Sequence, residues 1–382
     1  METRIIRPQH APHAYSYIPI LALRVAEMQA LEHLPEESKK RLMPAIQLRP
    51  WANAKEFEKG VERVEKAYGE EKKWIANLDS RYKKDPKKKV RDADIEFCRL
   101  KESTNGYKNW CDFVSHHKNI IPCVQLEETA QIPAQISTLS ELGRGLALYL
   151  SPETLRKIAA NREVMDALER TSNRGTFFII IDFGEISEQI VRSELHTLKQ
   201  CFSDLEKLPQ IGNTNVVLSG SSFPQQFDSG HQQQPIYERQ LYKAAITLNL
   251  QEIGNKRNLI YGDHASVAIR TPQFARAWYA RIDLVSNDEW NFFKSDTQFS
   301  EYETRSASYK RIATRAVESD AWDENLKTWG TVMIKNTKQG GEFPINSPRQ
   351  NVAARINTHL HLQAFYDRPE ERTKDFKEAW KD

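Results

Sequence analysis

The fold is indicated most clearly by the segment Phe177-Phe178-Ile179-Ile180-Ile181-Asp182-Phe183-Gly184. An apolar run without a polar interruption is typical of a strand that is buried on both faces, as in a parallel sheet covered by helices. An acidic residue and a glycine follow this run, where such a strand ends and a loop begins. The stretch therefore predicts a parallel α/β protein with polar groups at the carboxyl ends of its strands.

The same pattern, a short apolar run followed by a turn and a longer amphipathic segment, repeats along the chain. Candidate strands are Tyr17–Leu21, Met43–Leu48, Lys73–Leu78, Ile120–Leu126, Gly145–Leu150, Thr176–Ile181, Asn215–Leu218 and Leu259–Tyr261. The segments between them have helical periodicity and helix-start signals. About eight strand–helix units close a barrel, so we expect a (β/α)8 TIM-like barrel. An open doubly wound sheet is the alternative, because periodicity does not distinguish a closed sheet from one with two edges.

The region after the eighth candidate strand breaks this pattern. Residues 270–294 alternate apolar and polar positions and carry Trp278, Trp290, Phe292 and Phe293, which predicts an antiparallel β insertion. Helical periodicity returns from residue 300 to residue 320. We expect a single domain over residues 1–382, with a barrel core at about 15–266, the insertion at about 267–297 and a C-terminal elaboration at about 298–382.

Composition indicates a protein of the soluble globular class. Charged residues make up 28% and hydrophobic residues 39%, which excludes a disordered chain. The net charge of +3, from 55 basic and 52 acidic residues, argues against a dedicated nucleic-acid binder. The basic segment Lys83–Arg91 lacks interleaved aromatic residues, so it is interpreted as a solvated loop. The four cysteines form no Cys-x-x-Cys pair, so we expect reduced thiols. The chain shows neither a secretory signal nor an apolar run of about 20 residues, so we expect a cytoplasmic protein without membrane contact.

Acidic residues follow several of the candidate strands. Asp79, Glu127, Asp182 and Asp263 come from alternating positions around the expected ring, so their side chains could converge at one rim. Crowded carboxylates raise one another's pKa or recruit a cation. The competing interpretation for each one is a helix cap or a structural hydrogen bond.

Two further motifs are candidates for chemistry. The run Ser219-Gly220-Ser221-Ser222-Phe223-Pro224 follows a buried strand, and its small residues would let backbone N–H groups approach an anion. The alternative is a tight turn in which Phe223 fills the core and Pro224 opens a helix. His359 and His361 form a His-x-His pair that would face one side of a strand and could bind a metal, although a structural role is favoured.

Short motifs along most of the chain resemble the Beta protein family of phages, phage satellites and prophages. They are Tyr17-Ile18-Pro19-Ile20-Leu21, Arg24, Glu27, Met43-Pro44, Asp182-Phe183-Gly184, Ser222-Phe223-Pro224, Glu238, Tyr261-Gly262-Asp263, Trp329-Gly330 and Asn357-Thr358-His359. The chain departs from the family pattern at Ala22, Tyr149, Ile236 and His264, where Lys, Arg, Arg and Tyr are expected. If those basic residues bind an anion in relatives, this chain binds it differently or not at all.

The resemblance implies a barrel-like fold and a role in anti-phage defence beside a toxic or abortive-infection partner. Our first hypothesis is a protein that binds such a partner, with a small anionic ligand at the rim of the barrel. The aromatic insertion at Trp278–Phe293 would be its interaction surface or, equally, a lid packed on the barrel. The expected ligand-binding residues are Arg24, Glu27, Asp79, Ser222, Phe223, Glu238 and His359. The second hypothesis is an enzyme in which Asp182, Glu127 and Asp263 act as general acid and base on a phosphorylated or nucleotide-like substrate, with or without a divalent metal. No cofactor is indicated, and nucleic-acid binding through Lys83–Arg91 is the third hypothesis.

Overall fold

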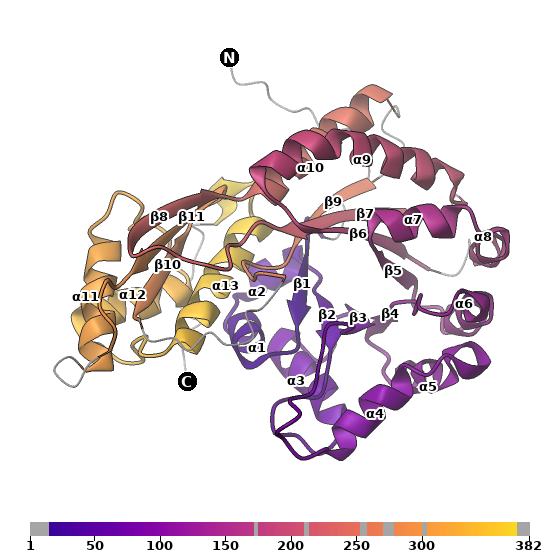
Figure 1. The fold of residues 1–382 in the computed structure, drawn as a ribbon, viewed down its shortest axis with the longest axis horizontal. Helices are drawn as coiled ribbons and strands as arrows, with labels where there is room; N and C mark the ends of the chain where they lie inside the picture. The colour runs from indigo at the N-terminus through magenta and orange to yellow at the C-terminus, as the bar shows by residue number, and fades with distance from the viewer. Residues whose placement is uncertain are drawn as a thin grey trace.

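The structure is a computed structural model that describes residues 15–171, 175–209, 214–252, 258–269, 279–299 and 304–372. An eight-stranded parallel sheet forms its larger part (Figure 1). The strands are β1 (Tyr17–Ala22), β2 (Ala45–Leu48), β3 (Trp74–Leu78), β4 (Ile120–Pro122), β5 (Leu146–Leu150), β6 (Phe177–Glu185), β7 (Thr214–Ser221) and β9 (Asn258–Asp263). All eight candidate strands of the sequence are therefore present, with ends that differ by a few residues.

The order of the strands is β4-β3-β2-β1-β9-β7-β6-β5, which follows the chain around a ring. The two ends of this sheet meet at a single parallel bridge between Cys123 and Ala147, where the N–H of Val124 donates to Ala147 O at 2.9 Å. The N–H of Cys123 donates to Ala76 O of β3, so the backbone N atoms of Pro122 and Val124 face β5. Because Pro122 has no N–H, the junction between β4 and β5, which we call the seam, lacks one inter-strand hydrogen bond. The sheet is thus nearly closed into a barrel, and the doubly wound alternative is wrong.

Helices cover the outside of the sheet. Those that follow strands β1 to β7 are α1 (Val25–Glu32), α2 (Glu36–Arg41), α3 (Glu58–Tyr68), α4 (Asp92–Leu100), α5 (Thr104–Ser115), α6 (Ile132–Ser140) with the preceding turn η1 (Thr129–Gln131), α7 (Pro152–Ala159), α8 (Arg162–Glu169), α9 (Glu188–Lys207) and α10 (Tyr237–Glu252). A large apolar core lies between these helices and the strands. A smaller one, built from inward residues such as Ile18, Ile75, Phe178 and Val217, fills the ring itself. The barrel is therefore a packed body, and only its rims are open to polar chemistry.

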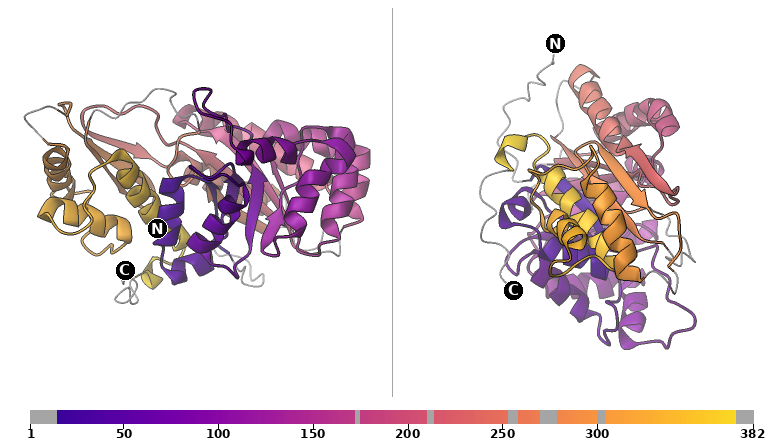
Figure 2. Two further views of the ribbon diagram at one scale, coloured as in Figure 1. Left: turned by 90° about the horizontal axis from the view of Figure 1, so that it is seen from below. Right: turned by 90° about the vertical axis from the view of Figure 1, so that its left-hand side faces the viewer.

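A second, antiparallel sheet lies beside the barrel, in the order β10-β11-β8 (Figures 1 and 2). Strands β10 (Arg281–Val285) and β11 (Glu289–Lys294) form the hairpin that the sequence predicts after the eighth strand. The third strand, β8 (Gly230–Pro235), was not expected, because it comes from the connection between β7 and α10. Helices α11 (Arg305–Val317) and α12 (Trp329–Gln339) pack on this sheet and enclose a separate apolar core.

The chain returns to the barrel with α13 (Pro348–Ala364), which is followed by the turn η2 (Pro369–Glu371). Ile356 and Leu360 of α13 belong to the barrel core, whereas Ala354 belongs to the core of the second sheet. The side chain of Asn357 joins the two parts, since it donates to Ala30 O at 2.9 Å and accepts from the N–H of Gly330 at 3.2 Å. Helix α13 is therefore shared by both bodies.

The aromatic residues of the hairpin lie inside the protein. Trp290 and Phe292 are fully buried, and Phe293 is 4% exposed. Trp290 donates its indole N–H to Ser266 Oγ at 2.8 Å, and its ring meets Phe223 edge to face. The hairpin is thus a packed element rather than an exposed aromatic surface; Trp278, at the start of the expected insertion, lies outside the described residues.

Candidate functional site

A layer of polar side chains lines the inside of the barrel at the carboxyl ends of the strands, which we call the mouth. Side chains alternate along a strand, so the residues two positions beyond the last apolar inward residue also point inward. In the mouth these positions hold Gln47, Asn77, Gln125, Tyr149, Asp182 and Ser219. A polar layer directly above a packed apolar interior is the arrangement expected of a recognition site in a parallel barrel.

Three amides of this layer form a chain. Asn77 Nδ2 donates to Gln47 Oε1 at 3.0 Å, and Gln125 Nε2 donates to Asn77 Oδ1 at 3.4 Å. Among the described residues, two buried polar atoms of the layer have no partner: Gln47 Nε2 and Ser219 Oγ. Because buried polar atoms are normally hydrogen-bonded, each of these two atoms is available for a further hydrogen bond.

Asp182 is the acidic centre of the mouth. Its carboxylate accepts from the phenol of Tyr149, from the N–H of Gly184 at 3.0 Å, and lies 3.1 Å from His264 Nε2. Burial by itself raises the pKa of Asp182, but the charge and hydrogen bond of His264, with the hydrogen bonds from Tyr149 and Gly184, outweigh it and hold the pKa well below its usual range. Burial also raises the pKa of Tyr149 far above its ordinary value. The trio therefore consists of a carboxylate, a neutral phenol and a histidine ring.

Arginines border this trio. Arg49 is paired with Asp79 at 2.5 Å, and Arg81 lies 3.9 Å from the same carboxylate. Arg24 pairs with Glu27 at 3.7 Å, and burial raises the pKa of Glu27 in spite of the nearby guanidinium groups. A cavity of about 20 Å³ lies between Arg24, Glu27, Arg81 and His264, which is room for about one water molecule. The structure thus brings three expected residues, Arg24, Glu27 and Asp79, to the same rim as Asp182.

Two of the three expected catalytic carboxylates do not join this cluster. The side chain of Glu127 is 64% exposed and lies 3.6 Å from Lys101. Asp263 faces outward, beneath α13, and is fully buried. The expected convergence of four rim carboxylates is therefore wrong for Glu127 and Asp263.

Both carboxylate oxygens of Asp263 already have hydrogen-bond partners. Asp263 accepts from the phenols of Tyr17 at 2.5 Å and Tyr261 at 2.8 Å, from the N–H of Ala265 at 2.8 Å, and pairs with His359 Nε2 at 2.6 Å. Burial raises its pKa, yet the charge of His359 and these hydrogen bonds lower it to about 2. With every lone pair engaged, Asp263 ties β1, β9 and α13 together and has no free oxygen for a ligand.

Ser222, Phe223 and Glu238 form another buried group, between the barrel and the second sheet. Ser222 donates from its backbone N–H to Glu238 at 3.0 Å and also from its hydroxyl, and that hydroxyl accepts from the N–H of Tyr237 at 2.9 Å. Ser222 thereby caps the start of α10. Phe223 is packed beneath the guanidinium of Arg355, 4.0 Å from the ring centroid. The core-filling interpretation of Phe223 is confirmed, but Pro224 opens no helix, because the chain continues to β8.

The histidine pair lies on a helix and not on a strand. His359 reaches Asp263, whereas His361 Nδ1 lies 2.9 Å from Ser38 Oγ, and burial lowers the pKa of His361 to about 3. The two rings therefore serve separate contacts. Within the described ranges, no three His, Cys, Asp or Glu side chains gather as a metal site would require.

Sequence reasoning missed Asn77 and Arg81, and it assigned no site role to Tyr149 or His264, which depart from the family pattern. The signal for Asn77 was available: it lies two positions after the inward residue Ile75. Nothing in the sequence indicates that His264 turns toward Asp182, because it follows the last residue of β9.

Comparison with known proteins supports one family. The model of the Beta protein family matches residues 17–365. The chain is 27% identical to Protein beta of Enterobacteria phage P4 over 359 residues, which covers 91% of this chain and 93% of that protein. No solved structure matches, and in the described part of the chain no helix is both long and apolar enough to cross a membrane. The ordered motifs of the sequence and this end-to-end match lead to the same conclusion: the chain belongs to the Beta protein family.

Proposed function

We propose that this Beta protein acts in anti-phage defence or toxin control by binding a protein partner, and that a small anionic ligand binds at the solvent-exposed rim of the mouth, where the side chains of Arg24 and Arg81 are 37% and 39% exposed, and influences this binding. The observation that carries the proposal is the loop from Asp79 to Arg91, between β3 and α4. Its first residues border the mouth, and its middle carries the basic segment. One loop thus connects a ligand site with an exposed surface.

The loop is fastened at both ends. Asp79 holds Arg49 at its start, and at its end Arg91 donates to Trp51 O at 2.9 Å and pairs with Asp94. An anion that draws Arg81 from Asp79 would change the charge balance at the start of this loop. The loop is therefore the element through which a ligand in the mouth would affect a partner.

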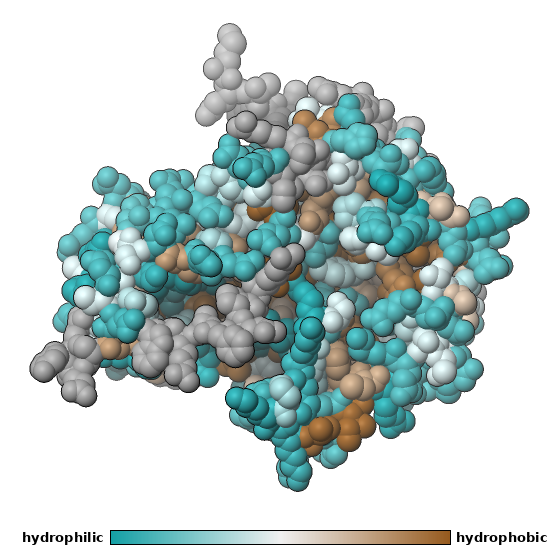
Figure 3. Space-filling view, viewed as in Figure 1, coloured by the Kyte–Doolittle hydropathy of each residue, from teal (hydrophilic) through white to brown (hydrophobic). Residues whose placement is uncertain are grey.

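The exposed part of the loop has the character of a protein interface. Val90 is 54% exposed and Ile95, on the first turns of α4, is 52% exposed. Figure 3 shows apolar surface at the lower edge of the molecule, over α4, next to hydrophilic surface. Five lysines lie between residues 83 and 89, so the surface combines an apolar spot with positive charge. A partner with an acidic rim around an apolar contact would fit it.

The test is affinity capture with the full chain, followed by titration of the captured and purified protein. The double variant Val90→Asp/Ile95→Asp should weaken binding at least tenfold, whereas Val332→Asp, an exposed apolar residue on α12, should not. Equal binding by the double variant would refute this surface. If DNA competes with the partner, and retention on DNA falls steeply with salt, the basic loop serves nucleic acid instead.

A second function is favoured by one observation, the contact of Asp182 with His264 in the mouth. In an enzyme, this pair and the phenol of Tyr149 would move a proton to or from a phosphorylated or nucleotide-like substrate bound by the arginines. Glu127 and Asp263 are not part of this version, for the reasons given above. Asp182→Asn should then abolish biological activity without loss of thermal stability, and full activity in that variant would make a catalytic Asp182 untenable.

A further inference from the structure

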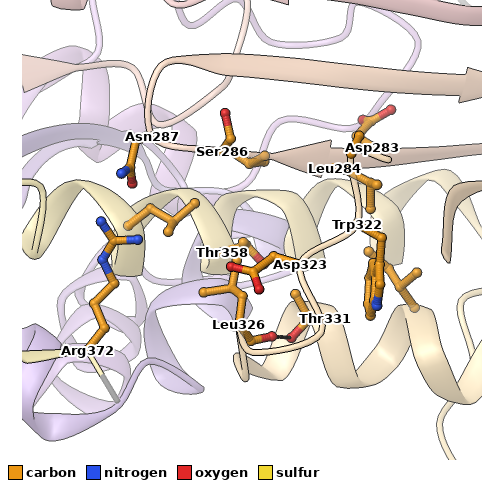
Figure 4. Close-up of a pocket in the computed structure, with 14 residues that line it drawn as sticks. Asp283, Leu284, Ser286, Asn287, Trp322, Asp323, Leu326, Thr331, Thr358 and Arg372 are labelled. Carbon is orange, nitrogen blue, oxygen red and sulfur yellow. Dashed lines mark hydrogen bonds between the residues drawn. The ribbon is translucent and has the colours of Figure 1, made fainter. Parts of the chain in front are cut away.

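A second cavity, unrelated to the mouth, lies where the hairpin meets α13. It has a volume of about 140 Å³ and is bordered by the end of β10 with its turn, by the loop at residues 321–326, and by α12 and α13 (Figure 4). The cavity is about as large as the engineered cavity of roughly 150 Å³ that binds benzene. It is therefore large enough for a small organic molecule.

One end of this cavity is polar and incompletely satisfied. Arg372 Nε and Nη2 are buried and have no partner among the residues that the structure describes, and the same holds for Asn287 Oδ1. Figure 4 shows the guanidinium of Arg372 directed toward Asn287. Burial lowers the pKa of Arg372, although Asp323 counteracts this. The polar end thus offers two N–H donors without an acceptor and one acceptor without a donor, and the charges of Asp323 and Glu370 offset only part of the desolvation of the guanidinium.

The other end of the cavity is apolar except for the indole N–H of Trp322. Leu284, Leu326, Ile334 and the indole of Trp322 line it, and Figure 4 shows Trp322 at the opposite side from Arg372. Ile334 is 2% exposed, so this end is closed by the core of the second sheet. A ligand here would need a compact apolar group next to a charged one.

We propose that this cavity binds a free α-amino acid with a small apolar side chain. Its carboxylate would accept from Arg372 Nε and Nη2, a side-on bidentate arrangement that guanidinium groups favour. Its ammonium would donate to Asn287 Oδ1 and face the carboxylate of Asp323, an exposed residue that also borders the cavity. Its side chain would lie between Trp322 and Ile334. This occupant satisfies both kinds of vacant polar atom at once, which neither a simple anion nor a simple amine does. The inference does not rest on the function proposed for the mouth.

The experiment is isothermal titration of the full chain with L-leucine, L-valine and L-methionine. We expect saturable binding of at least one of them at millimolar concentration or below. L-leucinamide, which lacks the carboxylate, and 4-methylpentanoate, which lacks the ammonium, should each bind at least tenfold more weakly than L-leucine.

Two variants locate the site. Arg372→Gln should reduce the affinity at least tenfold, whereas Arg368→Gln, four residues earlier and paired with Glu371 at 3.2 Å outside the cavity, should leave it unchanged. Asn287→Leu should reduce binding of L-leucine but not of 4-methylpentanoate; thermal melting of each variant establishes that it is folded. The proposal is overturned if none of the three amino acids binds, if folded Arg372→Gln binds like the parent, or if 4-methylpentanoate binds as tightly as L-leucine, which would indicate an anion site only.

Discussion

Glu238 should make the protein less stable as the pH rises through neutrality. The residue is 3% exposed, and burial, with the negative charge of Asp263, raises the pKa of its carboxyl group from 4.5 to about 8. The hydrogen bonds from Ser222 only partly oppose this shift. In the folded protein Glu238 is therefore mostly protonated at pH 7, whereas in the unfolded chain it is ionised.

The sign and size of the effect follow from proton linkage. Between pH 4.5 and pH 8 the folded state binds more protons at this site than the unfolded state, so the free energy of unfolding falls as the pH rises. Each pKa unit corresponds to about 1.4 kcal/mol, so the loss between pH 5 and pH 8 is roughly 3 kcal/mol. Glu238→Gln keeps an acceptor for Ser222 and removes the titration. Relative to the parent, the free energy of unfolding of Glu238→Gln should therefore rise by that amount between pH 5 and pH 8.

Urea unfolding followed by circular dichroism at pH 5, 6.5 and 8 measures this difference. Glu127→Gln is the matched control, because Glu127 is exposed to solvent. Its free energy of unfolding should change with pH in the same way as that of the parent. If Glu238→Gln also runs parallel to the parent across these pH values, Glu238 is ionised in the folded protein and the reasoning is wrong.

Three further predictions test the packing. Gly330→Ala should lower the midpoint of thermal unfolding, by an amount that corresponds to about 2 kcal/mol or more, because an added Cβ would lie 2.1 Å from the carbonyl oxygen of Ala354. Asp283→Asn should cost about 3 kcal/mol in urea unfolding, because it leaves the fully buried guanidinium of Arg355 without its charged partner. A thiol reagent such as DTNB should titrate one thiol per native chain, that of Cys98, since the other three cysteines are buried; two or more fast-reacting thiols in the native protein would contradict the packing.

Much of the fold could be read from the sequence because buried parallel strands have a strong local signature. Continuous apolar runs with helical segments between them located every strand of the larger sheet. Pro122 even marks the weak seam, since a proline inside an expected strand indicates a position without a ladder hydrogen bond. Strand β8 could not be predicted in this way: its sequence, Gly230–Pro235, contains three glutamines and no apolar run, and it is a strand only because β11 pairs with it.

The candidate site was harder to predict because it depends on direction rather than on residue type. Asp182 and Asp263 both follow the apolar residues of their strands, yet one points into the barrel and the other under α13. A shift of one residue along a strand places the side chain on the opposite face of the sheet. Trp290 is another residue whose direction the sequence does not give. If its side chain were on the surface, the protein would tolerate Trp290→Asp. The side chain is fully buried, so Trp290→Asp should unfold the protein.

The shared helix α13 has a consequence for synthesis of the protein. Strands β1 and β9 pair directly, but the helix that covers them begins at Pro348, roughly 85 residues after the end of β9. At a translation rate of roughly 5 to 20 residues per second, this interval is on the order of ten seconds. During that time β1 and β9 lack the cover of α13 on the ribosome, so a nascent chain halted before α13 would present apolar surface that chaperones and proteases recognise.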